Sequence, residues 1–163
     1  MSEKQKISVL MSVYIKENPT FLKDAIESVQ NQTLKPRELV LVEDGPLTPE
    51  LYQVLDQLEA ESDIPVKRYP LEQNQGLGLA LRQGVLQCQY DIIARMDTDD
   101  IAVPDRFEKQ VQLMEKDKLD VLGGHIAEFI DNPDEIVSYR RVPTQHADIV
   151  AYQRMRSAFN HMT

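Results

Sequence analysis

A nearly continuous apolar run, Ile7-Ser8-Val9-Leu10-Met11-Ser12-Val13-Tyr14, stands near the start of the chain. A strand with one face in water would alternate apolar and polar side chains, whereas a strand covered on both faces of a parallel sheet would not. We therefore expect residues 7–14 to form a strand inside a parallel sheet.

Helical and strand-like patterns alternate after this first strand. Asn18-Pro19 supplies a cap and a first-turn residue for a helix that should end near Gln32. Further strands are expected at residues 38–43, 66–69 and 90–96, and further helices from Thr48-Pro49, over residues 78–87 and from Pro104. This alternation predicts βαβ units, and hence an α/β fold whose mostly parallel sheet carries helices on both faces.

The pattern is mixed in the last part of the chain. We expect a strand and then a hairpin within residues 119–141, with an extended segment at 125–130 and a turn at Asn132-Pro133-Asp134. A last helix is expected from Thr144 and should contain Met155. Because no linker or repeat interrupts the sequence, we expect a single domain over residues 1–163.

The charge balance restricts the classes of partner. Acidic residues outnumber basic ones by 27 to 18, which gives a formal net charge of -9. Such a chain lacks the broad basic surface that the phosphates of a nucleic acid require, so we expect no nucleic-acid partner. An anionic diphosphate would bind to an acidic cleft only through a bridging divalent cation.

Cysteine content and hydropathy bear on the compartment. Cys88 is the single cysteine, which suits a reducing environment, and no apolar run has the ~20 residues that a membrane-spanning helix needs. The first residues also lack the pattern of a signal peptide. We therefore expect a cytoplasmic protein, which could still work at the inner face of a membrane.

Three polar clusters follow predicted strands, at residues 14–17, 43–45 and 97–100. Ligands of open parallel sheets bind at the carboxyl ends of the strands, where these clusters should lie. Asp97-Thr98-Asp99-Asp100 brings three carboxylates into four residues, and oxygen ligands of this kind select Mg²⁺ or Mn²⁺. Taken alone, the triplet equally fits a solvated acidic turn whose last Asp caps a helix.

The segment from Ile93 to Asp100, with Pro104 and Phe107 after it, resembles the D-x-D region of family 2 glycosyltransferases. Four upstream segments resemble motifs of the same family in the correct order: residues 7–14 with Glu17, Ser28–Thr33, Glu38–Gly45 and Asn74–Ala80. The resemblance extends over residues 7–106, and five motifs in register make it specific. It implies a GT-A fold, a Rossmann-like arrangement in which residues 7–106 bind the nucleotide and residues 119–163 begin the acceptor side.

The resemblance also implies roles for individual residues. Asp99 would be the principal metal ligand, Asp97 would contact the metal or the ribose, and Asp100 would hold the loop or reach the donor sugar. Asp44 would accept a hydrogen bond from the base, and Arg95 could pair with a carboxylate or the diphosphate. The remaining residues implied in nucleotide binding are Val13, Tyr14, Glu17, Gly76 and Arg82.

Two departures from the family pattern affect these roles. Ser12-Val13-Tyr14 stands where many members have Pro-x-Tyr, which changes the contacts expected for the base. Leu81 occupies the position of a usual Arg, and Arg82 that of the following Asn.

The activity implied by the resemblance is an inverting transfer of a sugar from a nucleotide diphosphate, with UDP expected, to a hydroxyl of a glycan or lipid-linked acceptor in polysaccharide synthesis. The cofactor would be Mn²⁺ or Mg²⁺. The family's catalytic base lies downstream of the D-x-D region, and no segment after Asp100 resembles its motif. We therefore expect the base beyond Thr163, slow or absent transfer by this chain alone, and self-association through the edge that a truncation would expose.

Two other functions remain open. The chain could be a nucleotide-binding module without turnover, which the missing base favours. A sugar-phosphate nucleotidyltransferase would share the sheet, but it requires a Gly-rich loop with a Lys after the first strand, and Val13-Tyr14-Ile15-Lys16-Glu17 is not such a loop.

Overall fold

The computed structural model describes residues 6–163, which form two compact units. The first unit ends at Lys118 and the second comprises Leu119–Thr163. This boundary lies close to the start of the expected acceptor-side part at residue 119.

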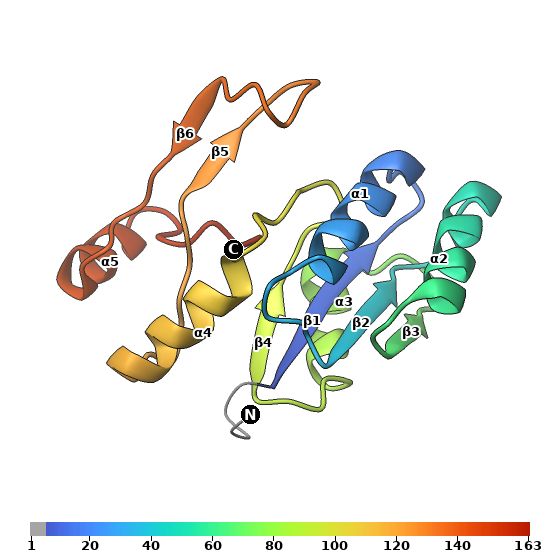
Figure 1. Ribbon diagram of the computed structural model, residues 1–163, viewed down its shortest axis with the longest axis horizontal. Helices are drawn as coiled ribbons and strands as arrows, with labels where there is room; N and C mark the ends of the chain where they lie inside the picture. The colour runs from blue at the N-terminus through green and yellow to red at the C-terminus, as the bar shows by residue number, and fades with distance from the viewer. Residues whose placement is uncertain (1–5) are drawn as a thin grey trace. The chain divides into compact units, whose positions relative to one another are not determined.

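The first unit is built on a four-stranded parallel sheet of order β3-β2-β1-β4 (Figure 1). Its strands are β1 (Ile7–Val13), β2 (Glu38–Glu43), β3 (Val66–Pro70) and β4 (Ile92–Arg95). β1 lies between β2 and β4, with Val13 opposite Glu43 and Leu10 opposite Arg95. The apolar residues of β1 and β2 are buried, as their continuous apolar sequences predicted.

Four helices connect and follow these strands: α1 (Pro19–Gln30), α2 (Pro49–Glu61), α3 (Leu77–Val85) and α4 (Arg106–Asp117). The first two begin as the sequence predicted, because the side chains of Asn18 and Thr48 accept N-terminal N–H groups and a Pro follows each cap. The helix expected from Pro104 begins at Arg106 instead. Pro104 lies in the preceding turn, where its carbonyl accepts the N–H of Thr33 at 2.8 Å.

Both faces of the sheet are covered, so the prediction of an α/β fold is confirmed. On one face, alternate β1 residues such as Val9 and Met11 pack in one cluster with residues of α1, α2 and α4. On the other face, Leu10 packs with Ala80 of α3. A Cβ at Gly84 of α3 would lie 2.4 Å from Leu10 Cδ1, so this helix packs very close to the sheet.

The second unit contains a hairpin and a helix. Strands β5 (Ile126–Glu128) and β6 (Ser138–Arg140) pair antiparallel, and α5 (His146–Gln153) follows. The predicted turn forms where Asn132 accepts the N–H of Asp134 on its side chain. Met155 lies outside α5 and is 90% exposed, so its expected place in the last helix was wrong. The helix ends at Gln153, and a turn follows in which the N–H groups of Met155 and Arg156 both donate to the Tyr152 carbonyl.

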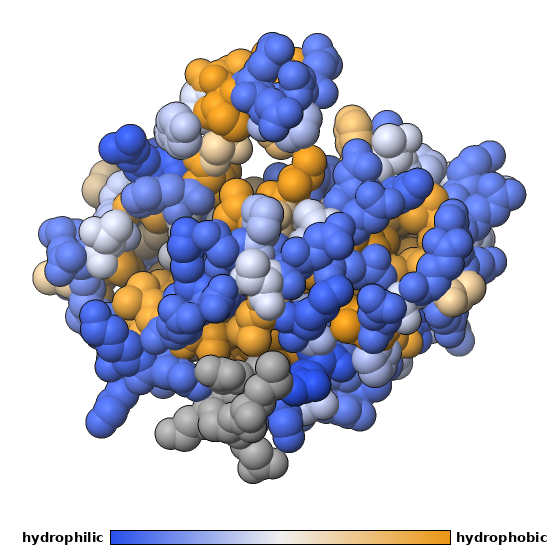
Figure 2. All heavy atoms as spheres, in the orientation of Figure 1, coloured by the Kyte–Doolittle hydropathy of each residue, from blue (hydrophilic) through white to orange (hydrophobic). Residues whose placement is uncertain are grey.

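The surface carries the excess of acidic and other polar residues. Figure 2 shows hydrophilic residues over most of the face in view, with apolar residues exposed only in places. None of the helices within residues 6–163 is long and apolar enough to cross a membrane.

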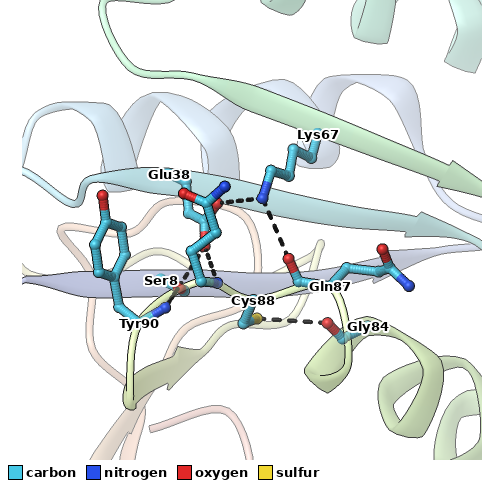
Figure 3. A network of polar contacts seen from close by, with 8 residues as sticks. Ser8, Glu38, Lys67, Gly84, Gln87, Cys88 and Tyr90 are labelled. Carbon is cyan, nitrogen blue, oxygen red and sulfur yellow. Dashed lines mark hydrogen bonds and ion pairs between the residues drawn. The ribbon is translucent and has the colours of Figure 1, made fainter.

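A buried carboxylate connects the first three strands (Figure 3). Glu38, only 2% exposed, accepts hydrogen bonds from Ser8 Oγ of β1 and from the N–H of Gln89, both at 2.6 Å. Its other oxygen pairs with Lys67 Nζ of β3 at 2.9 Å, and the same Nζ donates to the carbonyl of Gln87 at 3.3 Å. The network therefore attaches the segment between α3 and β4 to the sheet.

The surroundings of this network lower the pKa of Glu38 and raise the pKa of Cys88. Burial alone would raise the pKa of Glu38, but the hydrogen bonds from Lys67, Ser8 and the Gln89 N–H outweigh it and lower the pKa. Burial and the charge of Glu38 raise the pKa of the neighbouring Cys88 thiol, whose Sγ donates to the Gly84 carbonyl. Cys88 is therefore a structural thiol with little thiolate character.

Replacing Glu38 by Gln should lower the free energy of unfolding by about 1.5–3 kcal/mol near neutral pH, because charged hydrogen bonds are lost. Since the folded-state pKa of Glu38 is lowered, its stabilising contribution is present above the unfolded value of 4.5 and disappears as the pH falls through the folded value. The difference between wild type and Glu38→Gln should therefore shrink in acid. Urea denaturation at several pH values measures this.

The exposed Glu72 provides the control, since Glu72→Gln should change stability by less than about 0.5 kcal/mol. A Glu38→Gln protein as stable as wild type at neutral pH would show that the network does not hold the strands together.

Candidate functional site

The carboxyl ends of β1, β2 and β4 lie at one edge of the sheet, because these neighbouring strands are parallel (Figure 1). The N–H of Asp44 donates to the Val13 carbonyl at 2.8 Å, and the N–H of Met96 donates to the Leu10 carbonyl at 3.1 Å. The three polar clusters of the sequence, at residues 14–17, 43–45 and 97–100, therefore follow adjacent strands.

Asp97, Asp99 and Asp100 form an acidic cluster just beyond β4. One carboxylate oxygen from each lies within 4.8 Å of the others. Asp99 is exposed, whereas Asp97 and Asp100 are half-buried and Asp97 forms an ion pair with Arg95. Three converging carboxylates repel one another, and a hard divalent cation such as Mg²⁺ or Mn²⁺ would offset that repulsion with the oxygen ligands it prefers.

Arg106 contacts the strand that carries this cluster. Its guanidinium donates to the Arg95 carbonyl at 2.7 Å and to Met96 Sδ at 3.2 Å. Burial lowers the pKa of Arg106 to about 10, while the charge of Asp100 acts in the opposite direction and that of Arg95 in the same one. The side chain therefore remains a cation at neutral pH and places positive charge near Asp100.

Sequence reasoning missed Arg106 as part of the site. It stands in the first turn of α4, where the positive end of the helix dipole disfavours a basic residue. A basic residue at this unfavourable position could have indicated, from the sequence alone, that a tertiary contact stabilises the Arg106 side chain.

Thr98, the middle residue of the D-x-D segment, is buried and points to β1. Its hydroxyl donates to Glu17 Oε2 and lies 3.5 Å from the Ser12 carbonyl. Burial raises the pKa of Glu17, the Thr98 hydrogen bond lowers it, and the charges of Asp99 and Asp97 raise it further. Glu17 therefore belongs to the electrostatic surroundings of the acidic cluster, at the sheet edge where the sequence predicted both, although the bond with Thr98 itself was not predicted.

Asp44 is buried and connects the turn after β2 to the segment before α3. One carboxylate oxygen accepts the N–H of Gln75 at 2.7 Å, and the other accepts the N–H of Gly76 at 3.0 Å. Gly45 has a φ of 87°, and a Cβ there would lie 2.6 Å from the Asn74 nitrogen. The structure thus brings together two predicted site residues, Asp44 and Gly76. A carboxylate accepts about four hydrogen bonds, so these two N–H groups do not saturate Asp44.

The other predicted nucleotide-binding residues differ in placement. Val13 ends β1 and is buried, and Tyr14 follows it with 40% exposure. Arg82 is exposed on α3, and within residues 6–163 no hydrogen bond or ion pair links it to the acidic cluster. Val13 and Tyr14 are therefore at the expected edge, while the position of Arg82 relative to a ligand stays a prediction.

Solved structures share the fold. S. aureus TarS residues 1–349 in complex with UDP-GlcNAc matches with a TM-score of 0.59 and 21% identity, over 68% of this chain and 31% of that one. The mannosyltransferase PcManGT of Pyrobaculum calidifontis, in complex with GDP-Man and Mn²⁺, matches with a TM-score of 0.52 and 17% identity, over 59% and 28%. At these identities the likeness shows the fold alone, which is the GT-A fold that the resemblance implied.

Curated relatives are more similar in sequence. An uncharacterized glycosyltransferase of Haemophilus influenzae is 52% identical over 97% of this chain and 59% of its own length. The amylovoran biosynthesis glycosyltransferase AmsE of Erwinia amylovora is 43% identical, over 95% and 57%. An Escherichia coli UDP-Gal:alpha-D-GlcNAc-diphosphoundecaprenol beta-1,3-galactosyltransferase is 39% identical, over 96% and 56%. The chain thus spans a little over half the length of these relatives.

Replacing Asp44 by Ala should destabilise the first unit by about 1.5–3 kcal/mol, because the N–H groups of Gln75 and Gly76 lose a charged acceptor. Urea denaturation measures the loss, and Asp24→Ala, at an exposed position on α1, is the control with an expected change below about 0.5 kcal/mol. Equal stability of both variants would contradict a structural role for the Asp44 carboxylate.

The sequence pattern of one family extends over almost the whole chain. The family described as "Glycosyl transferase family 2" matches residues 8–162. The match includes the acidic cluster, Asp44 and Glu17, and it agrees with the relatives and with the fold of the solved structures. The chain therefore belongs to glycosyltransferase family 2.

Proposed function

We propose that this chain binds the donor of an inverting glycosyltransferase, in which a sugar passes from UDP to an acceptor hydroxyl. The observation that carries the proposal is the convergence of Asp97, Asp99 and Asp100 at the same sheet edge as Asp44. An acidic protein holds a diphosphate at such an edge through a divalent cation. The UDP-Gal in the name of the Escherichia coli relative and the UDP-GlcNAc complex of TarS support a UDP-sugar donor.

Asp99 and Asp97 are the proposed cation ligands. Asp99 is exposed, so its carboxylate is accessible to an ion and a diphosphate, whereas the carboxylate of Asp97 also neutralises Arg95. A bound Mn²⁺ or Mg²⁺ supplies charge stabilisation for the diphosphate leaving group. The Mn²⁺ complex of PcManGT supports the choice of ion. Asp100, close to the charge of Arg106, would hold the turn or contact the donor sugar.

The nucleoside would lie along the ends of β1 and β2. Asp44 carries acceptor capacity beyond its two backbone bonds, which would select a base with an N–H at its edge. Tyr14 offers an exposed ring for stacking, while Val13 and Gly76 provide backbone close to Asp44. Two further residues are proposed to contact the nucleotide. Glu17 lies beside the acidic cluster, and Arg82 lies on α3.

The acceptor is proposed from the relatives. AmsE is named for amylovoran biosynthesis, and the Escherichia coli galactosyltransferase acts on GlcNAc-diphosphoundecaprenol. A glycan or lipid-linked acceptor in polysaccharide or O-antigen synthesis follows by analogy. Such an acceptor would place the protein at the inner face of a membrane.

A second candidate function is donor binding without turnover by these residues alone. The acidic side chains of the second unit favour it: Glu128 is bound to Arg140 and Ser138, and Asp131, Asp134, Glu135 and Asp148 are all exposed. None of these has the burial that prepares a carboxylate for general-base catalysis. An assay of UDP-sugar transfer to glycan acceptors distinguishes the two functions.

The central test compares two carboxylates of the cluster. Asp99→Asn should raise the Kd for UDP in the presence of Mn²⁺ by at least about tenfold, whereas Asp100→Asn should have a smaller effect, because Asp99 is the proposed main ligand. Isothermal titration calorimetry with Mn²⁺ and with excess chelator measures both. Asp91→Asn, at the exposed amino end of the same strand, is the control and should bind UDP like wild type.

Two results would count against the assignment. Equal affinity of wild type with Mn²⁺ and with chelator would remove the cation from the proposal. An equal or larger effect of Asp100→Asn would transfer the metal role to Asp100.

A further inference from the structure

The side chain of Thr98 is oriented differently from those on either side of it. Thr98 is 3% exposed, while Asp99 is exposed and Asp97 is half-buried beside Arg95. The turn therefore presents carboxylates outward and a hydroxyl inward. A buried hydroxyl needs a hydrogen-bond partner, and the Thr98 hydroxyl bonds with Glu17, 81 residues earlier in the chain.

Glu17 is itself held in place from both sides. Its N–H donates to the Tyr14 carbonyl at 3.0 Å, which closes the turn after β1. The next residue, Asn18, caps α1 by accepting the N–H of Thr20 at 2.8 Å. The position of Glu17 is thus determined by a strand end and a helix start, so it offers a fixed attachment point for the D-x-D turn.

The turn needs such an attachment because of its charge. Asp97, Asp99 and Asp100 are within 4.8 Å of one another and repel in the absence of a cation. Glu17 adds a further carboxylate, whose charge repels those of Asp97 and Asp99, so a bond between the two segments is needed to offset that repulsion. The Thr98 hydroxyl supplies that bond, with a secondary contact to the Ser12 carbonyl at 3.5 Å.

We propose that the Glu17–Thr98 hydrogen bond anchors the D-x-D turn to the segment after β1 and so positions its carboxylates for the cation. Glu17 is then a positioning residue that acts through Thr98, in addition to any contact with the nucleotide. This inference rests on the proposed function, since it assigns a supporting contact to the same cation site. Supporting contacts of metal ligands typically contribute about 10–100-fold in metal affinity.

The test uses substitutions that separate the bond from the charge. Thr98→Val removes the hydroxyl at constant shape, Thr98→Ser keeps it, and Glu17→Gln keeps an acceptor oxygen but removes the charge. Thr33→Val is the control, because Thr33 Oγ1 donates to Glu108 Oε2 at 2.8 Å, in another bond from a Thr hydroxyl to a Glu carboxylate that has neither partner in the D-x-D turn. Two readouts are measured: amide hydrogen exchange of residues 97–100 without ligand, and the Kd for Mn²⁺ in the presence of UDP.

Thr98→Val should accelerate exchange at residues 97–100 and raise the Kd about 10–100-fold, while β1 amides exchange as in wild type. Thr98→Ser and Thr33→Val should match wild type in both readouts. Glu17→Gln should affect both less than Thr98→Val does. The double variant Glu17→Gln/Thr98→Val should be no worse than Thr98→Val alone, because both changes act on one contact.

Each contrary result identifies what has failed. Unchanged exchange in Thr98→Val would overturn the anchor, whether or not the wild type binds Mn²⁺ and UDP. Faster exchange with an unchanged Kd would reduce Thr98 to a structural residue and overturn its role in positioning. A loss of affinity in Glu17→Gln but not in Thr98→Val would assign Glu17 to direct nucleotide contact. Failure of the wild type to bind Mn²⁺ and UDP would refute the proposed function and, with it, the positioning of a cation.

Discussion

The parallel pairing of β1 with β2 on one side and β4 on the other determines where the polar residues of this chain meet. β1 contributes the turn that contains Glu17, β2 leads into Asp44, and β4 leads into the acidic cluster. Parallel neighbours end at the same edge, so Glu17 and Thr98, which are 81 residues apart in the sequence, come together there. Because β1 and β2 are buried on both faces, their pairing register is fixed, and with it the relative positions of the strand ends.

Electrostatics then decides what the edge can bind. The chain has a net charge of -9, and three carboxylates converge beyond β4. Two guanidinium groups partly offset them: Arg95 pairs with Asp97, and the half-buried Arg106 donates to the Arg95 carbonyl and lies near Asp100. In the proposed function, a divalent cation would complete this balance and would give an anionic diphosphate a positively charged partner.

Much of this arrangement was predictable from local patterns. Continuous apolar runs indicated β1 and β2, and Asn18-Pro19 and Thr48-Pro49 marked the starts of α1 and α2. The strand order β3-β2-β1-β4 could not be predicted from local patterns, because it depends on tertiary packing. Pro104 predicted the start of α4 two residues early, since its carbonyl is used by Thr33. Met155 continued an apolar spacing past the end of α5, but its side chain is 90% exposed and therefore packs in no core.

The candidate site likewise has a part that the sequence predicted and a part that it did not. The D-x-D spacing predicted a carboxylate cluster, and the structure forms one. Contacts between distant segments were invisible to sequence reasoning: Thr98 with Glu17, Asp44 with the N–H groups of Gln75 and Gly76, and Arg106 with Arg95. The role of Asp44 in base selection stays a prediction, now beside a structural role that its hydrogen bonds establish.

The most direct test of the cation site is paramagnetic broadening by Mn²⁺ in the NMR spectrum of the ¹⁵N-labelled chain. With UDP present, substoichiometric Mn²⁺ should selectively broaden the amide resonances of Asp97–Asp100, with weaker effects at Glu17 and weaker ones still at Asp91, at the amino end of β4. Broadening centred on Asp131–Glu135, or uniform broadening unaffected by UDP, would contradict a nucleotide-linked cation site at the end of β4.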